Sequence, residues 1–516
     1  MDYEPLDLSA WCNSGNDILQ WGEVEVGEHI WCGLPFLVGE AAPGHLVAFG
    51  EGGHVEAIEI TVGRSARWIV FAHVLLESEL GNGGPLGLEV ATFRFRFASG
   101  EEEVVPVRER FEIGRVGGAA KPFLAVPDRL DGLMPRAVGP WEQAGRRQTE
   151  SVAAAPHLFY LWSWQNPHRA DPVEAVVVEP HGPRFAVGAM TTSQLEETPI
   201  CREGSRRVVI EAPAAGDGDL EVRVDRGFAT YAHALPRASA EEFLEDGHSG
   251  WGEETSAGPS PAYSSVVASP SATVSVASGE EELGSVNWGE VLEKGAAEDP
   301  GRLKIEVVED GRSWVHTTVV DDETGKPVPC RVHFRSPRGI PYAPHGHHSE
   351  VNSNMGSWHI DVGGDVRLGQ ATYAYIDGTC QGWLPHGDVL VDVARGFEYE
   401  PLRARVQLRP GQRDLELRLK RWCHMNRDGW YSGDSHVHFL STQGSHTEAQ
   451  GEDLNVVNLL PSQWGSLFTN TEEFTGRESV SPDGSSIVYV GSENRQHFLG
   501  HLILMGLKEP VMPWCS

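Results

Sequence analysis

The sequence lacks a Cys-x-x-C pair, long apolar runs and an excess of basic residues. Its seven cysteines are scattered and odd in number, which excludes an evident disulfide framework or zinc knuckle and favours reduced, mostly buried thiols. The first residues lack the basic and apolar parts of a signal peptide, and no later run reaches the roughly 18 apolar residues of a membrane span. We therefore expect a soluble, cytoplasmic protein without a membrane partner.

The charge balance excludes another class of partner. Lys and Arg total 41 against 74 Asp and Glu, which gives a net charge of -33. Such a surface repels a phosphate backbone, so nucleic acid is not an expected partner. At 516 residues the chain is also too long for one core, and we expect about three or four domains. The oligomeric state is not indicated.

The first part of the chain, residues 1–238, alternates short strand-like runs with Gly-rich turns. In the run Phe93-Arg94-Phe95-Arg96-Phe97 one face is aromatic and the other basic, which is typical of a half-buried strand. We predict an antiparallel β-sandwich. The order of its pieces, including Trp162-Ser163-Trp164 before a strand, resembles the jelly-roll modules of bacterial carbohydrate-active and hydrolytic enzymes. Trp162 and Trp164 either stack on a sugar or, as the area they bury favours, belong to the core.

Two further segments follow. Residues 239–301 are rich in Ser, Gly, Ala, Glu and Pro, and this composition predicts a flexible linker or insertion. Residues 302–422 contain strand-like runs joined by turns, such as the one at Thr324-Gly325-Lys326-Pro327. They resemble the small seven-stranded β-sandwich of transthyretin-like and carboxypeptidase-regulatory domains, and we expect this sandwich to dock beside the next domain.

A histidine-rich loop lies within the second predicted sandwich. His345, His347 and His348 stand between Pro and Gly with no Cys or carboxylate at fixed spacing. A surface or structural role is the favoured interpretation. The functional alternative is a loop that reaches over a neighbouring active site.

The main chemical signal is the stretch from Gly429 to His438. Val437 separates His436 from His438, and an apolar pair follows, so the segment predicts a short buried strand with both imidazoles on one face. Asp434 falls on that face too. Two imidazoles and a carboxylate at one strand end are a common beginning of a metal site, although a lone His-x-His is also common on surfaces.

Further donors follow downstream. The run from Glu452 to Leu460 predicts a helix end entering a buried strand, and Glu493, His497 and His501 follow. His497 and His501 are four positions apart and could share a helix face, but the intervening residues lack the Glu of a His-Glu-x-x-His motif. A strand that begins at His501 is the preferred interpretation.

His-x-His, then Glu, then Gly-His before an apolar strand is similar to the carbaryl-hydrolase-like (CehA/McbA) metallohydrolases of the polymerase-and-histidinol-phosphatase (PHP) superfamily. The resemblance implies His436, His438, Glu493 and His501 as ligands of one or two divalent ions, Zn, Mn or Fe. It also implies a role for Asp434 in orienting an imidazole. The superfamily motif Thr-Asp-His is replaced here by a segment with Gln463, which could take a ligand or substrate-facing position.

The resemblance further implies that residues 423–516 begin an α/β barrel of the PHP type. Because such barrels need about 200 residues or more, we expect the chain to be a fragment with low activity of its own. The fold expected overall is thus a jelly-roll-like sandwich, a linker, a transthyretin-like sandwich and a partial PHP-type domain.

Two functional hypotheses result. In the first, the chain is a metal-dependent hydrolase that cleaves an ester, carbamate or phosphoester bond of a small-molecule or carbohydrate-derived substrate through a metal-activated water. In the alternative, it is a glycan-binding or scaffold protein of β-sandwich modules with a vestigial metal domain.

Overall fold

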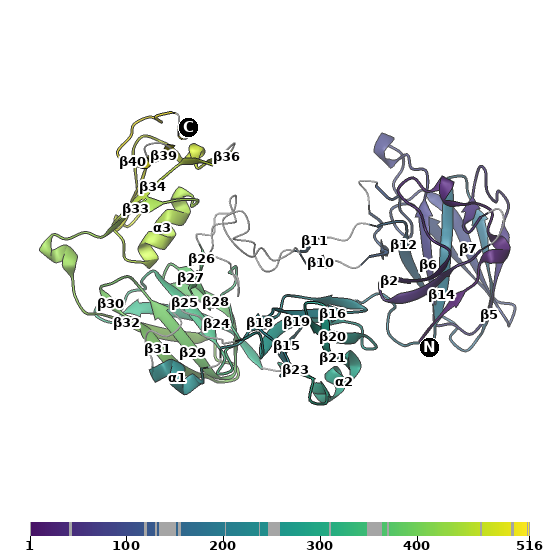
Figure 1. Cartoon of the computed structure of the whole chain (residues 1–516), viewed down its shortest axis with the longest axis horizontal. Helices are drawn as coiled ribbons and strands as arrows, with labels where there is room; N and C mark the ends of the chain where they lie inside the picture. The colour runs from purple at the N-terminus through teal and green to yellow at the C-terminus, as the bar shows by residue number, and fades with distance from the viewer. Residues whose placement is uncertain are drawn as a thin grey trace.

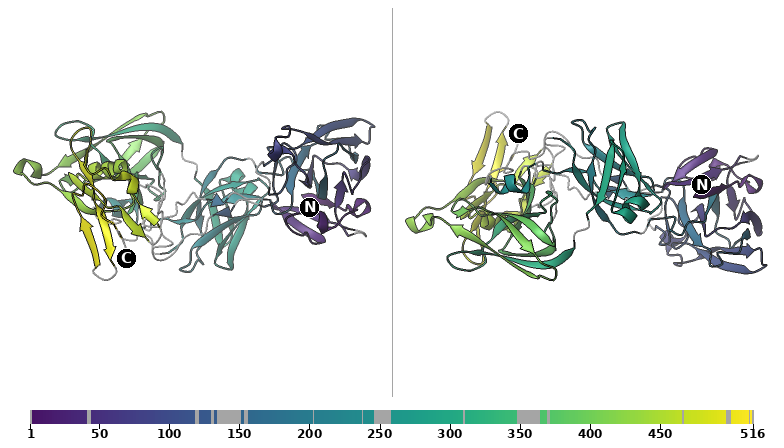
Figure 2. Two further views of the ribbon diagram at one scale, coloured as in Figure 1. Left: turned by 90° about the horizontal axis from the view of Figure 1, so that it is seen from above. Right: turned by 90° about the horizontal axis from the view of Figure 1, so that it is seen from below.

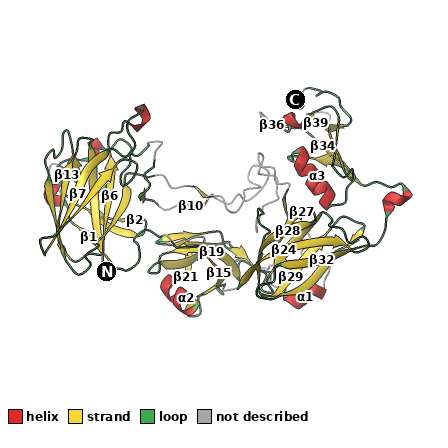
Figure 3. Cartoon of the chain, turned by 180° about the vertical axis from the view of Figure 1, so that it is seen from behind, coloured by secondary structure: helices red, strands yellow, loops and turns green. Residues whose placement is uncertain are grey.

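The computed structural model shows a multidomain protein made mostly of β-sheet, with few helices (Figures 1 and 3). Three β-sandwiches follow one another along an elongated row, and a small α/β module lies beside the third (Figure 2). The structure describes residues 2–40, 44–117, 121–129, 132–133, 151–152, 156–201, 203–236, 238–245, 258–308, 311–347, 364–368, 371–464, 467–496, 500–512 and 514.

The first sandwich confirms the predicted antiparallel sheets. One sheet has the order β1-β14-β6-β12-β9 with β4 beside β14, and the other has the order β5-β13-β7-β8. The strands are β1 (Tyr3–Leu6), β4 (Val47–Phe49), β5 (Ile58–Arg64), β6 (Trp68–Leu75), β7 (Glu89–Phe97), β8 (Glu102–Arg108), β9 (Ala125–Pro127), β12 (Tyr160–Gln165), β13 (Val173–Pro180) and β14 (Phe185–Ser193). The shorter elements here are η1 (Ser9–Trp11), η2 (Asn16–Ile18), β2 (Gly27–Trp31), β3 (Leu34–Val38), η3 (Leu80–Asn82), β10 (Gly132–Leu133) and β11 (Ser151–Val152).

The alternation read in β7 is confirmed by burial. Phe93, Phe95 and Phe97 are fully buried between the two sheets. Arg94 and Arg96 face outward and pair with glutamates of β13 and β5 in the same sheet. Successive residues of a strand point to opposite faces of the sheet, so β7 places aromatic side chains in the core and charged side chains on the outer surface. The pattern therefore placed the strand and its faces correctly.

Trp162 and Trp164 belong to this core. Trp164 is 6% exposed, and its ring stacks on Phe95 with centroids 3.5 Å apart. Trp162 is 5% exposed and packs against Phe71. Neither indole is free to stack on a sugar, so the core interpretation holds for both.

The predicted linker is wrong for its described part. From Ala262 onward it forms strands that pair with β15 and β16, and together they make a second sandwich. Its elements are β15 (Arg206–Glu211), β16 (Leu220–Val224), β17 (Gly227–Ala229), β18 (His233–Ala234), β19 (Ala262–Ala268), β20 (Thr273–Ser278), β21 (Glu281–Asn287), α2 (Trp288–Lys294), β22 (Ala296–Asp299) and β23 (Leu303–Val307). Residues 246–257 lie outside the described part.

The composition of β19 and β20 explains the error. Their inward side chains include Ala262, Val266, Val274 and Val276, all fully buried, while serines occupy intervening positions. Small buried residues lower the apparent hydrophobicity without lowering the quality of packing. The boundaries expected at residues 238 and 302 shift accordingly, because β15 to β18 and β23 also belong to the second sandwich.

The third sandwich packs a sheet of order β28-β24-β32-β30 on one of order β26-β27-β25-β29-β31. Its core also includes Val209, Leu235 and Tyr263 of the second sandwich, so the two share apolar contacts. Its elements are α1 (Ala240–Glu245), β24 (Arg312–Asp321), β25 (Cys330–Arg335), β26 (Asp365–Leu368), β27 (Ala371–Ile376), β28 (Thr379–Pro385), β29 (Gly387–Ala394), β30 (Tyr399–Glu400), β31 (Leu402–Leu408) and β32 (Asp414–Arg421).

The C-terminal module has a short sheet of order β33-β34-β38-β37, in which β33, β34 and β38 run parallel. Helix α3 connects the first two strands, as the sequence predicted for the helix end before Leu454. Its elements are η5 (Met425–Asp428), β33 (Gly433–Val437), α3 (Thr442–Gly451), β34 (Val456–Leu459), β35 (Ser462–Trp464), β36 (Leu467–Thr469), η6 (Thr471–Glu473), β37 (Glu478–Val480), β38 (Ile487–Val490), β39 (Ser492–Gln496) and β40 (Gly500–Leu504). The described strands form no closed α/β barrel.

An arginine clamp joins the third sandwich to this module. Asp453 follows α3 and pairs with Arg395 at 2.6 Å and with Arg421 at 2.9 Å, and all three side chains are largely buried. Asp453 also has a positive φ of 54°, a conformation that Asn and Asp adopt more readily than most residues. The sandwich thus docks beside the C-terminal module through a specific charged contact.

Asp453 offers a test of this clamp. Asp453→Ala removes the carboxylate that pairs with the buried Arg395 and leaves Arg421 with Glu398 alone. The loss should cost about 3 kcal/mol and should expose the chain around residues 422–432 to protease. Asp453→Asn keeps a side chain that tolerates the left-handed backbone. The difference in stability between Asp453→Asn and wild type then measures the effect of the lost charge. The further loss of stability in Asp453→Ala measures the cost of placing alanine in the left-handed backbone conformation. Equal proteolysis and melting in all three proteins would contradict the clamp.

A buried histidine makes the first sandwich sensitive to acid. His73 is fully buried in β6, and its Nε2 lies 2.9 Å from the carbonyl oxygen of Glu112. Burial lowers the pKa of His73 to about 4 from its usual 6.5, although the hydrogen bond opposes this shift. Between these values the unfolded chain binds a proton that the folded sandwich does not, so stability falls as the pH drops below 6.5.

We expect the opening free energy of β6 to fall by about 2 kcal/mol on going from neutral pH to about pH 5, measured by hydrogen exchange of the full chain. His73→Gln keeps an N–H donor but does not titrate, so it should remove most of this loss. His333 in β25, whose pKa is also lowered to about 4 by burial, serves as the internal control and should keep its pH dependence. Unaltered pH dependence of β6 in the variant would refute the assignment.

Candidate metal centre

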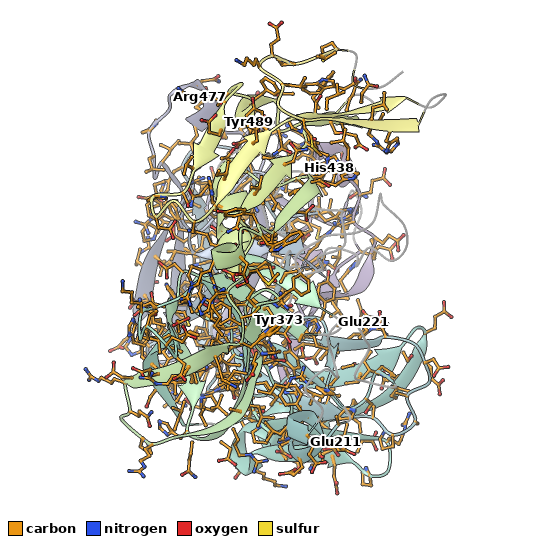
Figure 4. The ribbon with its side chains drawn as sticks, turned by 90° about the vertical axis from the view of Figure 1, so that its left-hand side faces the viewer. Glu211, Glu221, Tyr373, His438, Arg477 and Tyr489 are labelled. Carbon is orange, nitrogen blue, oxygen red and sulfur yellow. The ribbon has the colours of Figure 1, made fainter. Side chains whose placement is uncertain are left out.

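The C-terminal module gathers polar side chains at the carboxyl ends of its three parallel strands. His436 and His438 lie at the end of β33, Ser462 follows β34, and Glu493 follows β38. Strands that run parallel in adjacent positions end at the same sheet edge, which is where open α/β sheets place their sites. Figure 4 shows His438 in this module, near the β39–β40 hairpin.

Three donor atoms lie at metal-ligand spacing. The Nε2 atoms of His436 and His438 are 3.1 Å apart, and they lie 3.7 Å and 3.0 Å from the carboxylate oxygens of Glu493. Ligand atoms of all three residues fall within 4.8 Å of one another. Two tetrahedral ligands about 2.1 Å from a zinc ion are separated by about 3.4 Å, so this spacing matches a shared ion.

Glu493 is the buried centre of the group. The residue is 1% exposed, and its Oε1 accepts no hydrogen bond of good geometry among the described residues, although His501 Nδ1 lies 2.6 Å away. A buried carboxylate oxygen in this state fits a position that faces a cation. The two-imidazole, one-carboxylate donor set suits Zn, Mn or Fe and leaves coordination positions for water.

The backbone fixes one of the imidazoles. His438 Nδ1 lies 2.8 Å from the carbonyl oxygen of Leu460, which leaves Nε2 directed at Glu493. Burial lowers the pKa of His438 below its usual 6.5, and the Glu493 carboxylate partly opposes this. A neutral imidazole held by a second hydrogen bond is the form that binds metal.

Asp434 contacts the backbone and not, as expected, an imidazole ring. Its Oδ1 accepts the backbone N–H of His436 at 2.9 Å, so it shapes the end of β33 instead of orienting a ring. The strand itself differs too, because Gly433 to His436 are exposed where the sequence predicted a buried strand. β33 is the edge of its sheet, which explains the exposure.

Ser462 fills the position expected for Gln463. The Ser462 hydroxyl donates to Glu493 Oε2 at 3.2 Å, and Ser462 is fully buried. Neighbouring residues in a strand point to opposite faces, so Gln463 in β35 is directed away from this carboxylate. Sequence inspection missed Ser462 because an isolated serine carries no motif.

His501 and Arg495 complete the surroundings of Glu493. His501 lies in β40, which confirms the predicted strand, and its ring contacts Glu493 without belonging to the tight three-residue group. Arg495 Nε lies 3.8 Å from Glu493 Oε2 and is directly opposite His501 in the β39–β40 pair. His497, the alternative helical partner, lies outside the described residues.

The histidine loop of the third sandwich is separate from this group. His347 Nδ1 pairs with Asp365 Oδ1 at 2.9 Å, and the His345 ring contacts Trp314 with centroids 5.4 Å apart. His348 lies outside the described residues. The two described histidines therefore have partners within their own sandwich, as the structural interpretation expected.

Comparisons with known proteins add little to these observations. No protein-family model matches the sequence, and no curated protein matches it. Among solved structures, the backbone protein of the group B streptococcus pilus 2b aligns with 8% identity and a TM-score of 0.16, over 71% of this chain and 94% of that one. Within the described residues, no helix is long and apolar enough to cross a membrane.

Proposed function

We propose that the C-terminal module binds a divalent metal ion through His436, His438 and Glu493, and that the site hydrolyses an ester, carbamate or phosphoester bond. The observation that carries this proposal is the convergence of the three donors around a buried carboxylate. Their mutual distances of 3.0 to 3.7 Å suit one ion.

The chain's own residues would divide the work as follows. His438, fixed by Leu460, and Glu493, fixed by Ser462, would provide rigid ligands. The imidazole of His436 is 47% exposed and lies on the solvent side, where a substrate can approach. A bound divalent ion would supply Lewis-acid chemistry, lowering the pKa of a coordinated water and polarising the bond to be cleaved.

Arg495 and His501 would also serve this site, because each lies beside a carboxylate oxygen of Glu493. Their positive or proton-donating groups would help to hold the orientation of this carboxylate. Arg495 is also a cation beside the site, which suits an anionic substrate such as a phosphoester. We therefore rank a phosphoester first among the three bond classes.

The second candidate function is a binding or scaffold protein in which the metal site has no catalytic part. The observation that favours it is that three sandwiches form most of the described chain and are joined by specific contacts. Arg226 of the second sandwich, for example, lies over the Tyr3 ring of the first and pairs with Glu197 at 3.5 Å. Such junctions suit an ordered array of modules.

Metal content separates the two candidates. The purified full chain, loaded with Zn or Mn and desalted, should retain about one ion per chain by elemental analysis, and His438→Ala should weaken binding at least about ten-fold because it removes one of few ligands. His316→Ala, an exposed histidine of β24, is the matched control and should change nothing. Unchanged metal content in His438→Ala would refute the site.

Turnover is measured on the same proteins with p-nitrophenyl phosphate, bis-p-nitrophenyl phosphate and an aryl N-methylcarbamate. Activity that depends on the metal and is lost in His438→Ala supports the hydrolase. Metal binding without turnover on any of the three substrates would favour the scaffold candidate.

Ser462 provides a subtler test. Ser462→Ala removes the hydrogen bond to Glu493 while leaving all three ligands, so metal affinity should fall by about ten-fold, as is typical for groups that orient ligands. Ser485→Ala, an exposed serine of the same module, is the control. Identical affinities in the two variants would show that Ser462 does not position Glu493.

A further inference from the structure

A polar cavity is lined by residues of the second and third sandwiches, far along the chain from the proposed metal ligands. The two sandwiches lie next to each other in Figure 1. The volume of the cavity is about 620 Å³, within the usual range for small-ligand sites. The polar lining consists of Ser205, Arg206, Arg207, Ser265, Arg312 and Tyr342. Three guanidinium groups and no carboxylate line it among the described residues.

Two of these arginines have no counterion among the residues that the structure describes. Arg206 and Arg312 form no ion pair or side-chain hydrogen bond among the described residues, whereas arginines elsewhere, such as Arg395 and Arg403, are paired with aspartates. Arg207 is held in place, because its Nη1 donates to the carbonyl oxygen of Pro341 at 3.1 Å and its guanidinium lies 4.9 Å from the Tyr342 ring centre. Guanidinium groups that have no carboxylate partner in the described part of a chain of net charge -33 favour the binding of an anion at this place.

A pair of tryptophans lies beside this cavity. Trp314 of β24 and Trp383 of β28 are directly opposite in the sheet, with ring centroids 5.4 Å apart and planes at 79°. Trp383 is 52% exposed. The indole N–H of Trp314 donates to Gln381 Oε1 at 3.1 Å, which fixes that ring and leaves an amide beside it.

Two segments that line the cavity, β24 and the segment that begins at Tyr342, continue from the cavity to these tryptophan rings. Arg312 and Trp314 are two residues apart in β24, so they share the outer face of the sheet about 7 Å apart. The opposite wall runs from Tyr342 to His345, where the His345 N–H donates to the carbonyl oxygen of Gln381 and the ring contacts Trp314. The arginines and the tryptophans therefore belong to one continuous surface.

We propose that this surface binds an acidic oligosaccharide, with the carboxylate or sulfate groups of one sugar held by Arg206 and Arg312 and the ring of the next stacked on Trp383. Exposed aromatic rings suit the apolar face of a pyranose, and the fork of N–H donors on a guanidinium group suits two oxygens of a carboxylate or a sulfate. An exposed indole fixed by neighbours loses little freedom on binding. The proposal does not depend on the metal centre, which uses a different module.

The test uses the full chain in EDTA and isothermal titration with three probes. Hexagalacturonate supplies carboxylates, a heparin hexasaccharide supplies sulfates as well, and maltohexaose supplies neither. We expect one or both acidic probes to bind more tightly than maltohexaose, and this binding to weaken as salt is raised. Which acidic probe binds more tightly distinguishes the carboxylate from the sulfate source.

Variants locate the binding. Arg206→Ala with Arg312→Ala should lower the affinity for the acidic probe at least about ten-fold, and Trp383→Ala should lower it about five-fold. Arg427→Ala and Trp430→Ala remove an exposed arginine and an exposed tryptophan elsewhere and should change nothing. His438→Ala should also bind normally, so a failed metal site leaves this result intact.

Three outcomes would overturn the proposal. They are equal affinity for maltohexaose, no measurable binding of either acidic probe, and full affinity in the double arginine variant. A circular dichroism spectrum and melting curve equal to wild type are required of each variant, and Arg312→Lys, which keeps the charge, should recover part of the affinity if the fold is intact.

Discussion

The buried carboxylate of Glu493 is the constraint on which the C-terminal module depends. A carboxylate that is 1% exposed needs compensating cations or donors, and the module directs His436, His438, His501, Arg495 and Ser462 toward it. The parallel arrangement of β33, β34 and β38 makes this possible, because their carboxyl ends meet at one edge. The parallel order of these three strands thus determines both the local fold and which polar side chains meet at the candidate site.

The module is held in place by a second charged contact. Asp453 stands at the turn between α3 and β34, and its two arginines come from the third sandwich. Leu460 and Ser462 come directly after β34, so the contact at Asp453 holds the segment that leads to both of them. The third sandwich thus supports the candidate site through the contact between Asp453 and its two arginines.

The sequence predicted those parts of the structure that depend on local pattern. The alternation in Phe93 to Phe97 located a strand and its faces, and the His-x-His, Glu and Gly-His elements located residues that the structure brings to one carboxylate. Ser462 was not predictable, because its role comes from where β35 lies in space. Asp434 was placed near the site, but its bond to the His436 backbone depends on how the exposed edge strand ends.

The second sandwich shows where composition misleads. Its strands bury alanine and valine beside serine, so the segment has the composition of a linker although its small side chains pack well. The pairing of β19 with β15, more than fifty residues earlier, is a long-range contact that no local pattern reveals. The predicted domain boundaries were therefore wrong, whereas the prediction of several β-sandwiches was correct.

The central claim is that His436, His438 and Glu493 together hold one ion. X-ray absorption spectroscopy of the zinc-loaded full chain tests it most directly. We predict a first shell of nitrogen and oxygen near 2.0 to 2.1 Å with the scattering pattern of about two imidazoles and no sulfur. A shell containing sulfur, or one without imidazole scattering, would place the ion elsewhere and contradict the claim.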